Sequence, residues 1–276
     1  MSNITAADVA KLRKSTGAGM MDCKQALQEA NGDFEKAIEV IRKKGKAVAN
    51  KRADREAGEG VVLSKSSADN KYGAIVVLNC ETDFVAKNEN FVKLAQQFLD
   101  IALEAKTTSL EELKALPFEN TTVGEKVLEQ IGIIGEKLDL SYYASIDAEF
   151  VQHYIHPGNM LATLVGFTKD GLDEQVYKDV AMQVAAMNPV AVDKENVSQT
   201  IIDKELEIGM ELARKEGKPE NLVEKIAEGK LNKFFKENTL LNQEFVKDNK
   251  QTIKQYLQST DKDLSVIDFK RISLTA

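Results

Sequence analysis

Apolar residues recur at helical spacing over the first fifty positions and predict three short helices. Val9 and Leu12 share one face of the first helix, and the two glycines within residues 16–19 end it. Asn31-Gly32-Asp33 combines a C-cap, a turn and an N-cap between the second helix and the third. We therefore expect a compact three-helix module over residues 1–55, followed by a polar linker.

The apolar pattern changes its period after residue 60 and predicts a β hairpin. Residues 60–63 and 72–80 are strand-like around a polar turn, and the second stretch is apolar enough to be a central strand. A helix with one apolar stripe is expected from Asn90. Strand, turn, strand and helix recur over residues 150–187. We infer an internal duplication with antiparallel sheets.

Residues 198–235 follow a third pattern. Apolar residues repeat at a spacing of three to four on both sides of Gly217-Lys218-Pro219. This predicts an antiparallel helical hairpin with arms about 25 Å long, at 1.5 Å per residue, that projects from the body. The predicted fold class is α+β, with the module at residues 1–55, a first core copy at 56–146 and a second at 147–276.

Composition and the N-terminal residues indicate the cellular location to expect. Of 276 residues, 43% are hydrophobic and 29% are charged, which is typical of a soluble globular protein. The apolar runs are too short for a membrane span, and Met1-Ser2-Asn3-Ile4-Thr5 has no secretory pattern, so a cytoplasmic location is expected. Cys23 and Cys80 lie far apart and form no CxxC motif, and we expect reduced thiols.

The net charge of −7 argues against direct binding to nucleic acid. The charge is uneven, because residues 1–56 hold 12 Lys/Arg against 8 Asp/Glu, with basic residues concentrated at 42–55. This run is either a solvated helix end or a patch that steers an acidic partner. We favour the solvated helix end, since charge runs usually mark solvated faces.

No constellation for covalent catalysis is found. The sequence has no GxxxxGK[ST] loop and no GxGxxG motif after a strand. Its two histidines, His153 and His156, are three apart in a strand-like region and point to opposite faces, which disfavours a shared metal. We predict no catalytic residue, no metal site and no cofactor, and therefore no enzyme.

Two features favour protein binding instead. Met20 and Met21 are adjacent and cannot both face one small core, so at least one is expected to be exposed, where methionine suits an adaptable binding surface. The segment Glu81-Thr82-Asp83-Phe84-Val85 follows the central strand. A capped short helix would explain its polar residues but not Phe84 and Val85, while Glu81 is expected only to end the strand.

The duplication supplies a control for this segment. The second copy has an ordinary turn at residues 166–171 and no Thr-Asp-Phe triplet, so the scaffold does not require one. An aromatic side chain just outside a rigid sheet is well placed to anchor a partner's pocket.

Two stretches resemble the signatures of the elongation factor Ts family. They are Leu12-Arg13-Lys14-Ser15-Thr16-Gly17-Ala18-Gly19-Met20-Met21-Asp22-Cys23-Lys24-Gln25-Ala26-Leu27 and Asn79-Cys80-Glu81-Thr82-Asp83-Phe84-Val85-Ala86-Lys87. The resemblance also covers the duplicated core and the hairpin, and thus nearly the whole chain. It implies a guanine nucleotide exchange factor that binds elongation factor Tu in its GDP-bound and nucleotide-free states.

The resemblance also implies roles for particular residues. The first module would be a ubiquitin-associated-like bundle that touches the GTPase domain through Leu12, Met20 and Met21. Thr82, Asp83, Phe84 and Val85 would wedge between two helices of the partner, displace magnesium and promote GDP release so that GTP can rebind. Self-association through the core is left open. Longer members carry a helical module after the last strand, and that contact is expected to be missing here.

Two alternatives remain at this stage. The chain could be a ubiquitin-associated-type adaptor or chaperone that holds peptides through the first module. It could also bind RNA through the basic residues at 42–55, which predicts a steep dependence of affinity on salt. The acidic remainder of the chain argues against RNA.

Overall fold

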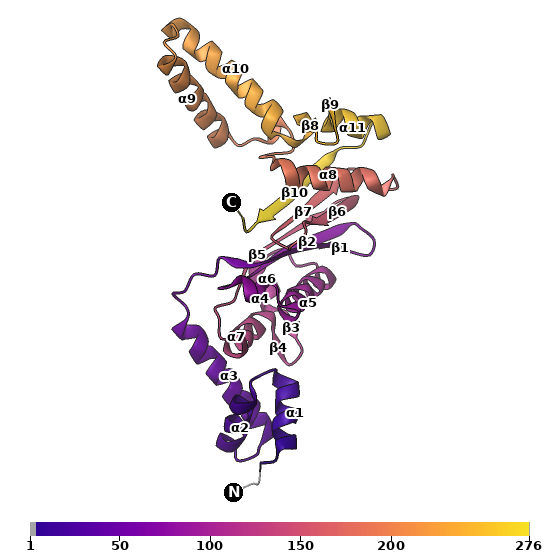
Figure 1. The fold of residues 1–276 in the computed structure, drawn as a ribbon. Helices are drawn as coiled ribbons and strands as arrows, with labels where there is room; N and C mark the ends of the chain where they lie inside the picture. Colours follow the sequence, from indigo (N-terminus) through magenta and orange to yellow (C-terminus); the bar gives the residue numbers. More distant parts are fainter. Residues whose placement is uncertain (1–3, 276) are drawn as a thin grey trace. The chain divides into compact units, whose positions relative to one another are not determined.

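A computed structural model describes residues 4–275. The chain forms two compact units (Figure 1). One contains residues 4–63 and 76–144, and the other contains residues 64–75 and 145–273. Helices and antiparallel sheets occur together in the described residues, which confirms the predicted α+β class.

The N-terminal three-helix module forms as predicted. Its helices are α1 (Ala6–Thr16), α2 (Met20–Glu29) and α3 (Phe34–Lys51). Thr5 and Asp8 form a capping box at the start of α1, and Gly17 ends that helix with a φ of 75°, a conformation that suits glycine. The small core consists of Val9, Leu12, Ala18, Cys23, Ala26, Leu27, Ala30 and Ala37.

The first sheet has the strand order β1-β2-β5. Its strands are β1 (Glu59–Ser66), β2 (Tyr72–Cys80) and β5 (Asp139–Asp147). Every residue of β2 is buried, so its nearly continuous apolar run does mark a central strand.

Helical segments lie between β2 and β5. They are α4 (Asp83–Ala86), α5 (Glu89–Ala105), α6 (Leu110–Ala115) and α7 (Val123–Ile134). The apolar stripe predicted for α5 is buried along its length. A small ribbon of β3 (Pro117–Phe118) and β4 (Thr121–Thr122) joins α6 to α7, and its two-residue strands are too short to leave a period in the sequence.

The second sheet has the order β10-β7-β6 and is antiparallel throughout. Its strands are β6 (Phe150–Ile155), β7 (Leu161–Phe167) and β10 (Val266–Ser273). Helix α8 (Glu174–Met187) covers one face of this sheet (Figure 1). Tyr177 of α8 stacks on Phe150 with ring centroids 3.9 Å apart and meets the edge of Phe167 at 4.8 Å, which fixes the helix on the sheet.

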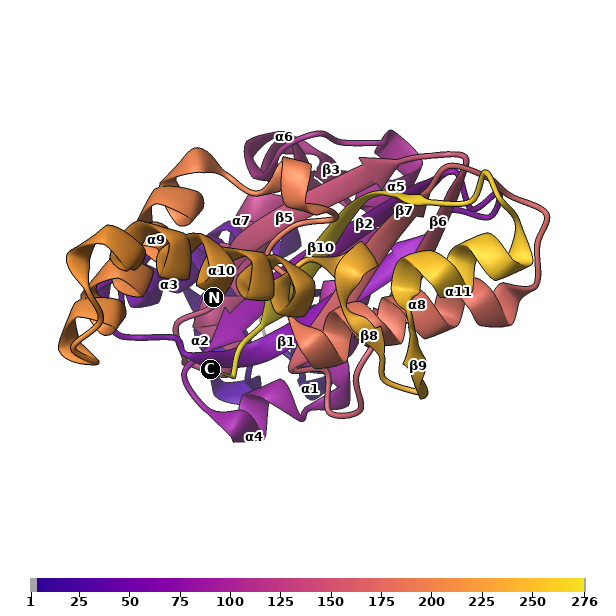
Figure 2. The ribbon, with the colours of Figure 1, turned by 90° about the horizontal axis from the view of Figure 1, so that it is seen from above.

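The remaining elements of this unit follow α8. They are η1 (Lys194–Asn196), α9 (Gln199–Lys215), α10 (Glu220–Asn238), η2 (Leu240–Asn242), β8 (Glu244–Phe245), β9 (Asp248–Thr252) and α11 (Ile253–Thr260). Helices α9 and α10 lie side by side in Figures 1 and 2 and form the predicted hairpin. Ala213, Val223 and Ala227 are buried between its arms, and Arg214 pairs with Glu220 at 2.7 Å across the loop.

The two sheets repeat one connection pattern. In each, a hairpin leads into a helix, and a later strand pairs with the second strand of the hairpin. The copies differ between the second strand and the helix. The first copy inserts α4 there, whereas the second has a turn through Gly171 at a φ of 75°.

Candidate protein-binding site

Helix α4 is a single capped turn that presents Phe84. The Thr82 hydroxyl accepts a hydrogen bond from the Val85 N–H at 3.4 Å, so Thr82 is the N-cap of the short helix. Ala86 is buried beneath the turn, while the Phe84 side chain is 83% exposed. Capping explains the polar residues but provides no burial for the aromatic ring, which is therefore available to a partner.

The end of α7 fixes the start of α4. Gly135 ends α7 in a left-handed conformation, and Glu136 follows it. The Glu136 carboxylate accepts hydrogen bonds from the Thr82 N–H at 3.1 Å and from the Thr82 hydroxyl at 2.7 Å. Hydrogen bonds to a charged acceptor are stronger than neutral ones, so this pair holds the turn firmly.

Glu81 does more than end the strand, contrary to the sequence-based expectation. Its carboxylate accepts hydrogen bonds from the Lys137 backbone N–H at 2.6 Å and from the Arg52 guanidinium at 2.7 Å. Those two bonds, the Lys137 bond first, lower the pKa of Glu81. The partners lie more than twenty residues away along the chain, so no local pattern could have shown this role.

The start of the predicted polar linker is also held by hydrogen bonds. Helix α3 extends to Lys51, and the Lys137 ammonium then donates to the carbonyls of Ala53 at 2.7 Å and Arg55 at 2.8 Å. Residues 52–55 and the base of α4 thus share Lys137 and Glu81 as anchors.

Asp83 and Val85 flank the exposed ring and are themselves half-buried. The Lys87 ammonium donates to the Asp83 carboxylate at 2.6 Å, and this hydrogen bond lowers the pKa of Asp83. The Lys87 side chain is 76% exposed and that of Asp83 is 47% exposed, so water screens the pair and a competing partner can separate it at little cost.

Cys80 lies beneath the turn. Its thiol donates to the carbonyl oxygen of Thr82 at 3.2 Å, and burial raises its pKa to about 12. The thiol is therefore neutral and serves as a small apolar filler with one weak hydrogen bond.

The N-terminal module carries a second apolar surface. Met20 and Met21 are 57% and 74% exposed, so both face solvent where the sequence required only one. They line a groove with Ile4, which precedes α1, and with Val9 of α1. Leu12 is fully buried in the bundle core, and its side chain is absent from that surface.

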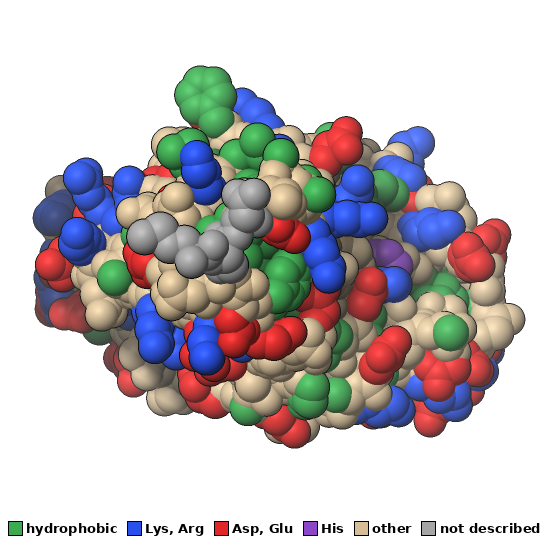
Figure 3. Space-filling model, turned by 90° about the horizontal axis from the view of Figure 1, so that it is seen from below, with side chains coloured by type: hydrophobic (Ala, Val, Ile, Leu, Met, Phe, Trp, Pro, Cys, Tyr) green, Lys and Arg blue, Asp and Glu red, His purple; other side chains and the backbone are tan. Residues whose placement is uncertain are grey.

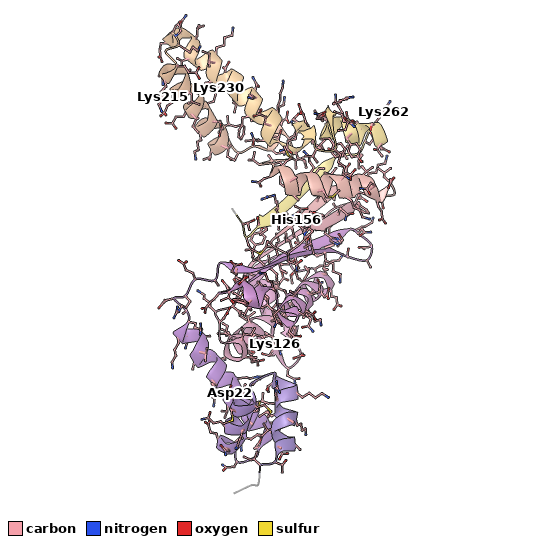
Figure 4. The ribbon with its side chains drawn as sticks, viewed as in Figure 1. Asp22, Lys126, His156, Lys215, Lys230 and Lys262 are labelled. Atoms are coloured by element: carbon pink, nitrogen blue, oxygen red, sulfur yellow. The ribbon has the colours of Figure 1, made fainter. Side chains whose placement is uncertain are left out.

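Three residues of the basic run at 42–55 are paired with carboxylates. Arg42 Nε lies 2.6 Å from Glu129, Arg52 bonds Glu81, and Lys44 pairs with Asp22, which Figure 4 labels on α2. Acidic and basic side chains are interspersed over the face shown in Figure 3. These pairs support the interpretation of the run as a solvated, locally neutralised helix end.

Residues 4–275 contain neither a metal-binding cluster nor a helix fit to cross a membrane. No group of three His, Cys, Asp or Glu side chains there is placed to hold a metal ion. Over the same residues, no helix combines the length and apolar character that crossing a membrane requires.

An exposed aromatic on a hydrogen-bonded turn and an exposed methionine pair are features typical of protein-binding surfaces. Comparison with known sequences identifies the protein family. A family model described as Elongation factor TS matches residues 81–276. Elongation factor Ts of Christiangramia forsetii is 52% identical over 276 residues, covering 99% of this chain and all of that protein. Elongation factor Ts of Porphyromonas gingivalis is 54% identical over 274 residues, and that of Bacteroides thetaiotaomicron is 41% identical over 330, each covering 99% of both chains.

The chain therefore belongs to the elongation factor Ts family, whose members act in the elongation stage of protein biosynthesis.

Proposed function

We propose that this protein is the guanine nucleotide exchange factor of elongation factor Tu. In this role it binds the GTPase, displaces magnesium from the nucleotide site and promotes release of GDP. Membership in the elongation factor Ts family supports the choice of partner. The observation that carries the mechanism is Phe84, which is 83% exposed on a turn whose base is fixed by Glu136 and Glu81.

Exchange needs a difference in binding rather than tight binding alone. A factor that binds the nucleotide-free GTPase more tightly weakens nucleotide binding by the same ratio, because the two equilibria are linked. A hundredfold weakening requires only about 2.7 kcal/mol of coupling. Filling a pocket with one phenylalanine contributes roughly 1.5–3 kcal/mol, so Phe84 alone supplies much of the coupling.

The residues beside Phe84 take distinct parts in the proposal. Phe84 is the apolar wedge that enters between two helices of the partner. Asp83 brings a carboxylate to the polar, magnesium-linked network there, after giving up Lys87 as its partner. Thr82 and Val85 set the shape and angle of the turn, since they are joined by the cap hydrogen bond.

The second contact in this proposal is the N-terminal module. Met20 and Met21 provide exposed, flexible side chains that adapt to an apolar surface of the GTPase domain. Leu12 supports them from the core of the bundle.

The test is release of a fluorescent GDP analogue from elongation factor Tu, followed as the concentration of this protein is raised. The parent should accelerate release, and Phe84→Ala should reduce the acceleration by about 10- to 150-fold, the equivalent of roughly 1.5–3 kcal/mol. Val246→Ala is the matched control, because Val246 is also a large exposed apolar residue, 50% exposed, in the other unit.

Two results would count against the proposal. If the parent leaves GDP release unchanged, the function is wrong. If Phe84→Ala matches Val246→Ala, the assignment of Phe84 as the wedge is wrong.

A further inference from the structure

Helices α3 and α7 approach so closely that a side chain would not fit between them. A Cβ atom added at Gly132 of α7 would lie 2.4 Å from the Cα of Gly45 in α3. A Cβ at Gly45 would lie 3.3 Å from the carbonyl oxygen of Leu128. Glycine at position 132 is therefore a requirement of this crossing, although glycine is a poor helix former.

Side chains on either side secure the crossing. Arg42 of α3 and Glu129 of α7 form an ion pair at 2.6 Å and are 37% and 19% exposed. Lys126, labelled on α7 in Figure 4, lies 3.9 Å from the same Glu129. Ile133 packs against the core of the three-helix module. The module is thus docked on α7 by apolar, ionic and backbone contacts.

The residues just past the end of the same helix bind the base of α4. Glu136 follows Gly132 by four residues and lies two residues beyond Ile134, the last residue of α7. Glu136 caps α4 through Thr82, and Lys137 binds both Glu81 and the end of the α3 segment. One short stretch of chain therefore touches the module that carries Met20 and Met21 and the turn that carries Phe84.

We propose that the Gly45–Gly132 crossing is a positioning element that holds the methionine pair and Phe84 at a fixed spacing, so that both engage one partner at once. Two anchors on a rigid frame present the second contact at a high effective concentration once the first has formed. A module on a loose tether would lose orientational freedom on binding and so bind more weakly. The part of this inference that concerns binding rests on the proposed function.

The docking is tested on the full-length protein alone. Gly132→Ala should open the crossing, and hydrogen–deuterium exchange of the α3 amides and of residues 52–55 should accelerate while α5 stays protected. Gly229→Ala is the matched control, since Gly229 is also within a helix and has nothing within 4 Å of an added Cβ. Alanine favours both helices intrinsically, so a purely local effect would increase protection in both variants. Unchanged or increased protection of α3 in Gly132→Ala would overturn the proposal.

The spacing is tested by GDP release from elongation factor Tu. Gly132→Ala should raise the half-saturating concentration about tenfold and leave the plateau rate unchanged, because Phe84 itself is intact. A lower plateau with an unchanged half-saturating concentration would overturn the positioning role. If the parent protein has no exchange activity, both the proposed function and the two-point contact are wrong. If the parent is active and Gly132→Ala binds elongation factor Tu as the parent does, only the two-point contact is wrong.

A charge swap at the Arg42–Glu129 ion pair distinguishes loss of the crossing from misfolding of the Gly132→Ala variant. Arg42→Glu should raise the half-saturating concentration as Gly132→Ala does, and Arg42→Glu combined with Glu129→Arg should restore it. Failure of the double variant to recover binding, with its unfolding midpoint normal, would contradict the role of the crossing.

Discussion

Glu136 binds Thr82 twice, through the backbone N–H at 3.1 Å and the side-chain hydroxyl at 2.7 Å. The acceptor stands just beyond the end of α7, and the donor is the first residue of the capped turn at α4. The position of the exposed Phe84 ring thus depends on a carboxylate that lies 54 residues beyond Thr82 along the chain.

Replacing Glu136 should loosen α4 without unfolding the protein. Glu136→Ala removes two charge-assisted hydrogen bonds at a half-buried site, and we expect a loss of about 1–3 kcal/mol in the local stability of the turn. Hydrogen exchange of the Val85 and Ala86 amides should quicken, and GDP release should slow although Phe84 is unchanged. A double-mutant cycle with Thr82→Val tests whether the two residues act together. Additive losses would contradict the link, since contacting residues couple by about 0.5–3 kcal/mol.

Substitutions at Asp83 and Lys87 should have different effects on the free energy of unfolding and on the rate of GDP release. Their ion pair is exposed and spans one helical turn, so Lys87→Gln should change the free energy of unfolding by no more than about 0.5 kcal/mol. Under the proposed mechanism Asp83→Asn slows GDP release, whereas Lys87→Gln does not, because it leaves the Asp83 carboxylate free for the partner. Urea unfolding and nucleotide release, measured on both variants, decide the matter. If both variants slow GDP release equally, exchange depends on the Asp83–Lys87 ion pair and not on the Asp83 carboxylate alone.

The Cys80 thiol should resist modification in the folded protein. Its pKa rises from 9.0 to about 12 through burial, so reaction with a disulfide reagent at pH 8 should be slow until denaturant is added. The pKa is also linked to stability. Between pH 9 and 12 the folded state retains a proton that the unfolded state has lost, so the free energy of unfolding falls as pH rises through that window. In Cys80→Ala the free energy of unfolding should fall less steeply over that pH window. Rapid labelling of Cys80 in the native protein would contradict its burial.

His153 should make the second unit sensitive to acid. Burial, followed by the charges of Lys65 and Lys178, lowers its pKa below the usual 6.5. Its Nδ1 accepts a hydrogen bond from the Ser66 N–H at 3.2 Å, which requires the neutral ring. Below pH 6.5 the unfolded state binds a proton that the folded state resists, so stability should decrease as the pH falls.

The measurement for His153 is the urea midpoint between pH 7.5 and 5. His153→Asn keeps an acceptor for Ser66 but has no titrating ring, and its midpoint should depend less on pH than that of the parent. Identical pH profiles would mean that other groups carry the acid sensitivity.

Periodic patterns predicted most of the scaffold. Helix α8 ends at Met187, where the predicted repeat of strand, turn, strand and helix ends, and β2 and the α9–α10 hairpin also form where apolar spacing placed them. These elements owe their form to burial of a repeating face, which the sequence displays directly. The ribbon of β3 and β4 escaped prediction because two-residue strands have no period.

The candidate site was visible only in part. The sequence allowed a capped short helix after β2 and indicated exposure of a methionine, because both follow from local residue types. It did not indicate the hydrogen bonds that Glu136 makes with Thr82 and that Arg52 and Lys137 make with Glu81, because these depend on tertiary proximity. It also gave no sign that Gly132 serves a helix crossing, since an isolated glycine within a helical pattern has several explanations.

The turn that carries Phe84 is an addition to a unit that exists twice, and the second copy closes the same connection without it. Its supports come from the end of β2, from residues just past α7 and from the end of α3, so removing them breaks no strand ladder. The scaffold and its working part are therefore separable in engineering terms. A protein designer could lengthen, shorten or transplant α4 onto another hairpin-and-helix unit, provided that two carboxylates equivalent to Glu81 and Glu136 travel with it.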